Sequence, residues 1–337
     1  MRTHKAAVVG LGNIGMMYDY EAQRPHPSTH AFAYQDSPYY ELICGVDNSE
    51  SKQKLFRELS QTARFYVSLD EAMESGTLND AEVVSICTPP SSHVEIVKKL
   101  ISSNIGKILF CEKPIVQNAH EAGEILDILR SSSTLVVPNI SRRWNRGLRN
   151  IGDYLKSGKI GEVEKINVRY TRGIYNTGAH LFDLIHMWTG DKIASVSALS
   201  ETKTSSYPEK SYNFYFETEN GITGYAEAVN DYNYYLFEMD LYCTGGKVEM
   251  RNSGDDVNYY STTSHHLFDG YKELKCEEQY SHLLEDSCIK NAINNIHNVM
   301  LGKEEPYCSV MDAIYPVLIA EALEKSYNSR RAVEVTL

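Results

Sequence analysis

The chain has 337 residues, which is more than one ordinary domain needs and enough for two. Its 33 Lys and Arg against 45 Asp and Glu give a formal net charge of -12, which argues against a nucleic-acid binder and against attachment to an anionic membrane surface. The hydrophobic content of 42% is typical of a globular protein with a real core, and no apolar run approaches the ~20 residues that span a bilayer.

The start of the chain and its cysteines bear on compartment and metal content. The sequence MRTHKAAVVGLG passes from a charged start directly into a strand-like run, without the ~7–15 apolar residues of a signal peptide, so we expect a cytoplasmic protein. The seven cysteines form no CxxC pair, which predicts neither a disulfide framework nor a zinc site. His4 and the pair His265–His266 have no acidic companion at metal-ligand spacing, so no metal site is predicted.

Residues 1–138 alternate between strand-like and helix-like segments. Helices are expected at His93–Ser102 and at Ala119–Leu129, where the apolar residues are spaced for one helix face. Strands separated by helices predict an α/β domain with a parallel sheet covered on both sides. The expected strands are Ala6–Val9, Leu42–Val46, Val83–Ile86, Ile108–Cys111 and Leu135–Val137.

The pattern changes after Pro138, and residues 139–337 predict an α+β domain with a large, open, mainly antiparallel sheet. A helix over Arg146–Ser157 is followed by long runs rich in Tyr, Phe and Val, and Asn220–Gly221 is typical of a hairpin turn. Two helices, Ser281–Met300 and Ser309–Ser326, precede a possible last strand at 332–337. The expected strands are Val163–Tyr170, Ile193–Glu201, Ser211–Glu217, Ile222–Val229 and Tyr234–Cys243.

The first strand leads into the sequence GLGNIG, a dinucleotide-binding fingerprint of the Rossmann type. Gly10, Gly12 and Gly15 would allow a tight turn and close approach of the backbone to a pyrophosphate, with Asn13 and Ile14 between them at a helix N-terminus. Asp47 ends the second strand, where a carboxylate accepts from the ribose 2′-hydroxyl and repels a 2′-phosphate, which favours NAD over NADP. The alternative is a plain glycine turn that joins a strand to a helix.

The helix after Gly15 is interrupted. Pro25 and Pro27 cannot lie inside a helix, and a helix-like pattern resumes only at His30–Gln35. The inserted residues begin beside the expected phosphate site, so Tyr18, Asp19 and His26 are candidates for the mouth of the site, with Tyr18 a candidate substrate contact. A surface loop is the equally weighted alternative.

Three further segments point to a known family. CTPPSSH (Cys87–His93) and FCEKP (Phe110–Pro114) follow expected strands, and TGAHLFDLIHMWTG (Thr177–Gly190) lies in the second domain. Together with the glycine fingerprint, in order and spacing over essentially the whole chain, they resemble the glucose–fructose oxidoreductase / inositol dehydrogenase / MocA family. The resemblance implies a catalytic Lys113 and a His180 that acts on the substrate hydroxyl. It also implies cofactor contacts by Thr88, Pro89, His93, Glu112 and Lys113.

Physical reasoning supports the first two roles. A lysine at the carboxyl end of a parallel strand faces the crevice where ligands bind, and a histidine across the crevice can share the proton. The alternatives are a surface lysine and a helix-start histidine. Asp183 lies one helical turn after His180. A structural role and a substrate-binding role are equally expected for it. Many members of the family carry Asp four residues before this histidine, whereas this chain has Asn176, which can orient a hydroxyl but cannot take its proton.

Arginines cluster at the expected domain junction, in the segment PNISRRWNRG. Arg142, Arg143 and Arg146 are candidates for an anion site, with Arg143 proposed as a substrate contact, because arginine forks suit phosphate. A solvated, salt-bridged helix start is the favoured alternative. Trp144 is expected to pack rather than to stack on a ligand.

These observations predict an NAD-dependent oxidoreductase, with NADP less favoured, that moves a hydride between nicotinamide and a carbinol carbon of a sugar-like substrate. The preferred substrate is a nucleotide-activated sugar of the UDP-N-acetyl-hexosamine type, and free sugars or inositols are the alternative. A dinucleotide-sensing regulator without turnover is the alternative from another functional class. The open sheet exposes a broad face, and the resemblance implies that such faces pair between copies, so we expect a homodimer or homotetramer.

Overall fold

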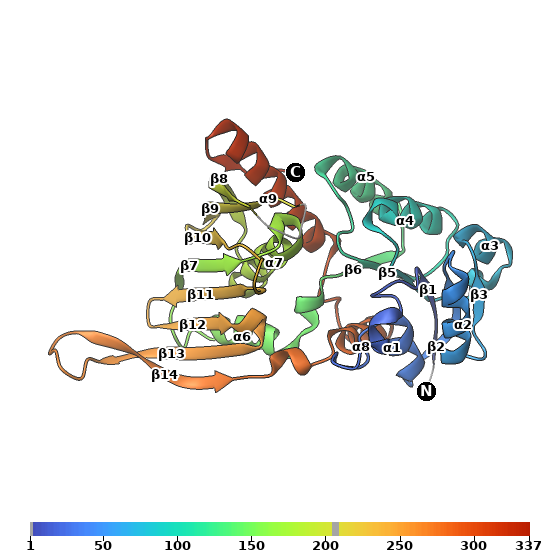
Figure 1. Cartoon of the computed structure of the whole chain (residues 1–337), viewed down its shortest axis with the longest axis horizontal. Coiled ribbons are helices and arrows are strands. Elements are labelled where there is room, and N and C mark those ends of the chain that lie inside the picture. Colours follow the sequence, from blue (N-terminus) through green and yellow to red (C-terminus); the bar gives the residue numbers. More distant parts are fainter. Residues whose placement is uncertain (1–2, 204–208) are drawn as a thin grey trace. The chain divides into compact units, whose positions relative to one another are not determined.

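The chain forms two compact units, each with its own sheet (Figure 1). The computed structural model describes residues 3–203 and 209–337. The first unit comprises Met1–Trp144 and Ser287–Ile314, and the second comprises Asn145–Asp286 and Tyr315–Leu337. Within the described residues, no helix has the length and apolar character that crossing a membrane requires.

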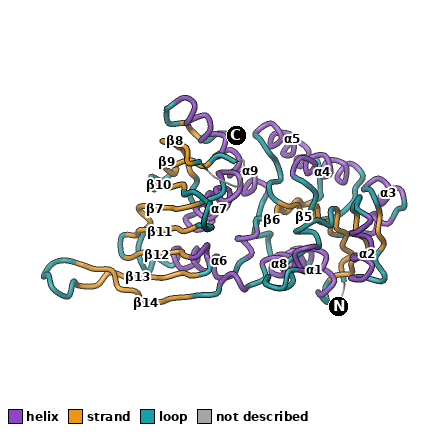
Figure 2. Tube along the Cα trace, viewed as in Figure 1, coloured by secondary structure: helices purple, strands orange, loops and turns teal. Residues whose placement is uncertain are grey.

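The first unit holds a six-stranded parallel sheet in the order β3-β2-β1-β4-β5-β6. Figure 2 shows its strands alternating with helices, as the sequence predicted for a Rossmann-type domain. The inner strands are buried on both sides because helices cover both faces of such a sheet. The strands are β1 (His4–Val9), β2 (Tyr40–Val46), β3 (Arg64–Tyr66), β4 (Val83–Ile86), β5 (Ile108–Glu112) and β6 (Leu135–Asn139). The helices are α1 (His30–Asp36), α2 (Glu50–Leu59), α3 (Leu69–Glu74), α4 (His93–Ser102) and α5 (Ala119–Arg130).

The insertion after the glycine turn interrupts a helix whose hydrogen-bond pattern resumes on the far side of the inserted loop. The N–H of His30 donates to the carbonyl of Ile14 at 3.2 Å, and the N–H of Ala31 donates to that of Gly15 at 3.0 Å. These are the bonds that an uninterrupted helix would form four residues on. The chain therefore leaves the helix after its first turn, forms a loop that includes a 3-10 turn at Met17–Tyr20, and re-enters at His30.

The division into units differs from the boundary expected after residue 138. Helix α8 (Cys288–Met300) belongs to the first unit, although residues 145–286 precede it. It packs beside β2, where the hydroxyl of Tyr40 donates to the carbonyl of Ile293 at 2.7 Å and Tyr39 stacks on His297. Such a return of the chain leaves no local signal in the sequence.

The second unit holds a nine-stranded sheet in the order β14-β13-β12-β11-β7-β10-β9-β8-β15. All neighbours are antiparallel except β7 and β10, which confirms the open, mainly antiparallel sheet. One face packs apolar residues of α6 (Arg146–Lys156), α7 (Gly178–Thr189) and α9 (Val310–Ser329) into a core around Trp188, Phe182 and Phe214. The strands are β7 (Val163–Tyr170), β8 (Ile193–Thr202), β9 (Ser211–Thr218), β10 (Thr223–Ala228), β11 (Phe237–Cys243), β12 (Gly246–Arg251), β13 (Asp256–Ser264), β14 (Lys272–Tyr280) and β15 (Val333–Glu334).

The sequence did not predict β3, β12, β13 or β14. Strand β3 has three residues, too few to show a periodicity. Strand β14 is exposed along most of its length, so its residues show no apolar alternation. The hairpin of β13 and β14 is held together by backbone pairing, which composition does not reveal.

Candidate functional site

The glycine turn after β1 is shaped by close packing at two of its three glycines. Gly10 has a φ of +94°, and a Cβ there would lie 2.7 Å from the carbonyl carbon of Cys87. A Cβ on Gly15 would lie 2.0 Å from the carbonyl oxygen of Gly10. A Cβ on Gly12 would meet no atom within 4 Å. Two glycines are therefore required by the fold, and the third borders open space.

That open space is lined by backbone donors. The first helical turn bonds the amides of Met16 and Met17 to the carbonyl of Gly12, while the amides of Gly12, Asn13 and Ile14 have no acceptor among the described residues. A helix N-terminus with free N–H groups and no side chain in front of it suits a phosphate. The residues present therefore fit the pyrophosphate of a dinucleotide.

Asp47, at the end of β2, is oriented by two backbone amides. The N–H of Leu11 donates to Oδ2 at 2.8 Å, and the N–H of Ser49 donates to Oδ1 at 2.9 Å. The carboxylate is half-buried, and each of its oxygens retains a lone pair for a hydroxyl. Asp47 is thus fixed beside the glycine turn, where a ribose diol would be recognised.

The loops after β4 and β5 are tied together by His93. Its ring is fully buried, with Nδ1 2.8 Å from the carbonyl oxygen of Pro114 and Nε2 2.8 Å from that of Thr88. His93 was expected to contact the cofactor. Instead, its buried ring connects the two loops that carry Thr88 and Lys113 and stabilises them. Thr88 is half-buried and Pro89 is exposed, so both remain accessible to a ligand.

Glu112 ends β5 directly before the half-buried Lys113, and its carboxylate lies on a buried polar cluster. Oε1 is 2.8 Å from Nε2 of His30 and 2.6 Å from Nδ2 of Asn139. The sequence predicted no role for His30, and it drew attention to Asn139 only as part of the segment PNISRRWNRG that resembles the family's domain junction. The available signal was the polar residue at the start of the resumed helix.

In the second unit, His180 is carried by α7, which follows a short π-helical turn at Gly173–Thr177. Asn176 and His180 are half-buried, whereas Asp183 is 1% exposed on the core side of α7. Turns of this kind occur often at functional sites. The turn begins three residues after the end of β7, so few residues separate this strand from His180.

The π-helical turn is fixed at its start. Arg172 and Gly173 have φ values of +64° and +79°, and a Cβ on Gly173 would lie 2.5 Å from that of Glu209. The N–H of Gly173 donates to Oγ of Ser211 at 2.9 Å. These contacts define where Asn176 and His180 lie relative to the sheet of the same unit.

The insertion is organised by Asp19. Its side chain is 1% exposed and accepts hydrogen bonds from the amide of Ser28 at 2.8 Å and the hydroxyl of Thr29, and it pairs with His26. Asp19 is therefore a loop-forming residue rather than one that faces the mouth of a site. Tyr18 is half-buried, with the guanidinium of Arg24 3.6 Å from its ring centre.

The arginines at the junction form internal ion pairs. Arg143 is buried, and its Nη2 donates to Asp312 at 2.9 Å. Arg146 forms a two-point pair with Asp286. The structure therefore corrects the expected anion site and substrate contact of Arg143, because these guanidinium groups are committed to carboxylates of their own units. Trp144 is buried and packs, as predicted.

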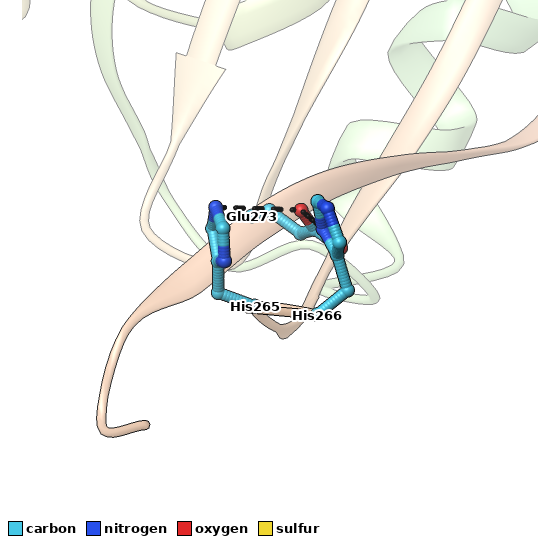
Figure 3. Close-up of side chains that lie close together, drawn as sticks. All are labelled: His265, His266 and Glu273. Carbon is cyan, nitrogen blue, oxygen red and sulfur yellow. Dashed lines mark hydrogen bonds and ion pairs between the residues drawn. The ribbon is translucent and has the colours of Figure 1, made fainter. Parts of the chain in front are cut away.

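A cluster of His265, His266 and Glu273 lies at the β13–β14 hairpin (Figure 3). Nδ1 of His266 is 2.9 Å from Oε2 of Glu273, and Nε2 of His265 is 3.8 Å from the same oxygen. The acidic residue beside the two histidines therefore comes from the opposite strand, β14, and not from a position close in sequence. The amides of Leu267 and Phe268 donate to Nδ1 of His265, which places the proton of the neutral ring on Nε2, toward Glu273. His266 is thus hydrogen-bonded to Glu273, and His265 lies beside the same carboxylate oxygen.

The chain belongs to the Gfo/Idh/MocA family. Residues 4–140 match the model of the oxidoreductase family with an NAD-binding Rossmann fold, and residues 171–249 match the model of the GFO/IDH/MocA C-terminal domain. The N-terminal unit is accordingly an NAD-binding Rossmann domain, as the glycine fingerprint predicted.

Comparisons with individual proteins agree with this family. A segment covering 47% of the chain is 31% identical to an uncharacterized oxidoreductase of Schizosaccharomyces pombe and covers 39% of that protein. Inositol 2-dehydrogenase 1 of Paenarthrobacter aurescens is 23% identical over 66% of the chain and 65% of its own length. The chain thus spans less than two thirds of either relative. A super-repressor mutant of Gal80p from Saccharomyces cerevisiae shares the fold, with a TM-score of 0.78 at 14% identity over 99% of this chain and 98% of that one.

Proposed function

We propose that the protein is an NAD-dependent oxidoreductase that acts on a hydroxyl-bearing carbon of a sugar-like substrate. The observation that carries the proposal is the order of groups in the first unit. The phosphate-binding turn follows β1, and Lys113 follows β5, at the same carboxyl edge of one parallel sheet. Ligands of such sheets bind at this edge.

Bound NAD supplies the hydride acceptor, and the chain's own side chains manage the proton. Nζ of Lys113 accepts the proton of the substrate hydroxyl as the C–H bond breaks. The ring of His180 shares this proton and stabilises the developing alkoxide. Asn176 orients a neighbouring hydroxyl, because an amide donates and accepts but cannot act as a base.

The substrate is proposed at two levels of detail. The broader level is a polyol or cyclic sugar, which agrees with the similarity to an inositol 2-dehydrogenase. The finer level is a nucleotide-activated hexosamine. The ion pairs of Arg143 and Arg146 remove the arginine argument for a nucleotide-linked phosphate. Free sugars and inositols are therefore the first compounds to test.

The test is the absorbance of reduced nicotinamide with purified protein, NAD or NADP, and a panel of inositols, free sugars and nucleotide sugars. Turnover that disappears in Lys113→Ala and in His180→Ala, with NADH binding retained, supports the proposal. Turnover that survives both substitutions, or the absence of NADH binding in the wild-type protein, contradicts it.

A regulator that senses the dinucleotide is the second candidate, because the fold of Gal80p spans nearly the whole chain. This candidate predicts NADH binding without turnover on any member of the panel. It also predicts that Lys113→Ala leaves the biological output unchanged.

We further propose a homo-oligomer that pairs through the uncovered face of the nine-stranded sheet. Tyr215 and Asn167 are exposed there, and a hollow of about 430 Å³ lies between them and Tyr225. The exposed aromatic surface would be covered by a second copy. Light scattering at micromolar concentration tests this, and a monomeric mass contradicts it.

A further inference from the structure

A chain of buried hydrogen bonds runs through the first unit to the end of β5. His30 is fully buried between Ser85, 2.8 Å from Nδ1, and Glu112, 2.8 Å from Nε2. Oη of Tyr34 is 2.8 Å from Oγ of Ser85, and Nδ2 of Asn139 is 2.6 Å from Oε1 of Glu112. This series of hydrogen bonds joins α1, β4, β5 and β6, and it includes Glu112, the residue that precedes Lys113.

The direction of each bond follows from the groups that can only donate or only accept. Nε1 of Trp144, which is only a donor, lies 2.8 Å from Oδ1 of Asn139. The indole therefore fixes the amide orientation and turns the Asn139 NH₂ group toward Glu112. A carboxylate only accepts, so the His30 ring must carry its proton on Nε2, facing the same oxygen.

The remaining bonds agree with a proton on Nε2 of His30. Burial raises the pKa of Tyr34 well above its usual value, so its hydroxyl stays protonated and is hydrogen-bonded to Oγ of Ser85. The hydroxyl of Ser85 then donates to Nδ1 of His30, which is the acceptor nitrogen of this tautomer. The described bonds of Tyr34, Ser85, His30 and Asn139 are thus consistent with a proton on Nε2 of His30 that faces Glu112.

The consequence for Glu112 is that its two oxygens differ. Oε1 receives N–H groups from both His30 and Asn139, whereas Oε2 has no hydrogen-bond partner among the residues that the structure describes. The side chain is 13% exposed, so the carboxylate reaches the surface through its second oxygen. A carboxylate held on one side by two donors is oriented and can accept from a ligand through its other oxygen.

We propose that His30 and Asn139 are positioning residues for the cofactor site. By clamping Oε1, they direct Oε2 of Glu112 toward a hydroxyl group of the bound nicotinamide nucleotide, next to Lys113. This inference rests on the proposed function, because it assumes that the nucleotide binds at this edge of the sheet. Preorganisation is the physical benefit, since an acceptor that is already fixed loses no rotamer freedom on binding.

Two substitutions of His30 separate positioning from packing. His30→Gln places an amide near the position of Nε2 and keeps a donor to Glu112. His30→Asn reaches only the position of Nδ1, so it keeps the contact with Ser85 and loses the one with Glu112. We expect the Kd for NADH, measured by fluorescence titration, to rise about tenfold in His30→Asn and to stay within about threefold in His30→Gln, as for loss of one charge-assisted hydrogen bond.

Ser85→Ala is the matched control for stability. It removes a hydrogen bond from the far end of the same buried chain and leaves both donors to Glu112 in place. We expect its melting temperature to fall while the Kd for NADH stays near the wild-type value. The proposal is overturned if Ser85→Ala weakens NADH binding as much as His30→Asn does, or if His30→Asn binds as tightly as His30→Gln.

A measurement on the wild-type protein keeps the proposal testable if His30→Asn fails to fold. In protein labelled with ¹⁵N-histidine, long-range ¹H–¹⁵N spectra report the tautomer of each ring, and His30→Gln assigns the signal. We expect His30 to carry a proton on Nε2 at neutral pH. A neutral ring protonated on Nδ1, which has no proton to donate to Glu112, would overturn the proposed clamp. Failure of the wild type to bind NADH would contradict the proposed function instead, and the spectrum would still decide the His30–Glu112 pair.

Discussion

The N–H of Leu11 donates to Oδ2 of Asp47 across 36 residues of sequence, at 2.8 Å. This bond connects the glycine turn to the end of the neighbouring strand, so the phosphate site and the ribose site form one rigid element. The same carboxylate accepts from the N–H of Ser49 through its other oxygen. An acidic group that is held this way keeps its orientation whether or not a nucleotide is bound.

Asp47→Asn is therefore expected to reduce the preference for NAD over NADP. The amide keeps the size of the side chain but loses the charge that repels a 2′-phosphate and one of the acceptors for the ribose hydroxyl. Loss of a hydrogen bond to a charged group corresponds to about a tenfold change in affinity. Titration of the protein with NADH and NADPH measures the ratio of the two Kd values.

The neighbouring Asn48→Ala is the control, because Asn48 is exposed and precedes α2. It should leave the ratio unchanged. An unchanged ratio in Asp47→Asn as well would mean that the ribose is recognised elsewhere.

The glycines of the turn predict two opposite phenotypes. Gly12→Ala places a methyl group in open space, so its free energy of unfolding should stay within about 0.5 kcal/mol of the wild type. Its Kd for NADH should rise about tenfold or more, because the methyl group occupies the space of the pyrophosphate. Gly15→Ala forces a Cβ to 2.0 Å from the carbonyl oxygen of Gly10, so it should destabilise the first unit by about 1–3 kcal/mol or more.

Denaturant unfolding and NADH titration of both variants test this contrast. Normal NADH binding by Gly12→Ala would exclude the space in front of this residue as the phosphate site. A Gly15→Ala variant as stable as the wild type would show that the turn can widen.

The sequence predicted most of the first sheet, because parallel strands buried on both faces appear as short apolar runs between amphipathic helices. It also placed the glycine turn after β1 and Asp47 at the end of β2, because both positions depend on local backbone geometry. Residues that act through distant partners were not predicted correctly. Arg143 was taken for a ligand contact because Asp312, its partner, lies 169 residues away.

His30 was overlooked for the same reason, since it lies on α1 and its partners Ser85 and Glu112 come from β4 and β5. The second sheet was predicted only in part, because the hairpin of β13 and β14 is mostly exposed and stabilised by backbone pairing. Sequence patterns thus identify the faces that are buried and the turns that need glycine. They do not identify which buried polar groups meet.

His297 predicts a loss of stability on acidification. Burial, together with the nearby His4 and Lys303, lowers the pKa of His297 below its ordinary value of 6.5. Its Nδ1 is buried without a hydrogen-bond partner among the described residues, and the ring stacks on Tyr39. The native state therefore binds fewer protons than the unfolded state, so this contribution is complete above about pH 6.5 and is lost as the pH falls toward the lowered value.

His297→Phe keeps an aromatic ring against Tyr39 and removes the titration. Between about pH 7.5 and pH 5.5, its melting temperature should fall less than that of the wild type, because the wild-type ring must be protonated at a cost. Both proteins contain the same other titrating groups, so subtracting one change in melting temperature from the other removes the contribution of those groups. Parallel melting curves over this range would show that His297 plays no part.

Asn139→Asp turns the proposed clamp into a pH-dependent one. The new carboxylate would still accept from Trp144, but its second oxygen would face Oε1 of Glu112 across the present 2.6 Å. Two carboxylates at this distance must share a proton, because the like charge raises the pKa of one of them. At low pH the shared proton replaces the amide N–H and holds Glu112 in place. As the pH rises the proton is lost, and repulsion displaces Glu112.

The Kd for NADH of Asn139→Asp should accordingly increase between about pH 5.5 and pH 8, relative to that of the wild type at each pH. Asn139→Leu separates this effect from simple loss of the donor, since it removes the amide and adds no titrating group. Its deficit in binding should not depend on pH. If the Kd of Asn139→Asp followed the same pH dependence as that of Asn139→Leu, the carboxylate of Glu112 would not be the group through which Asn139 acts, and the clamp would lose one of its two donors.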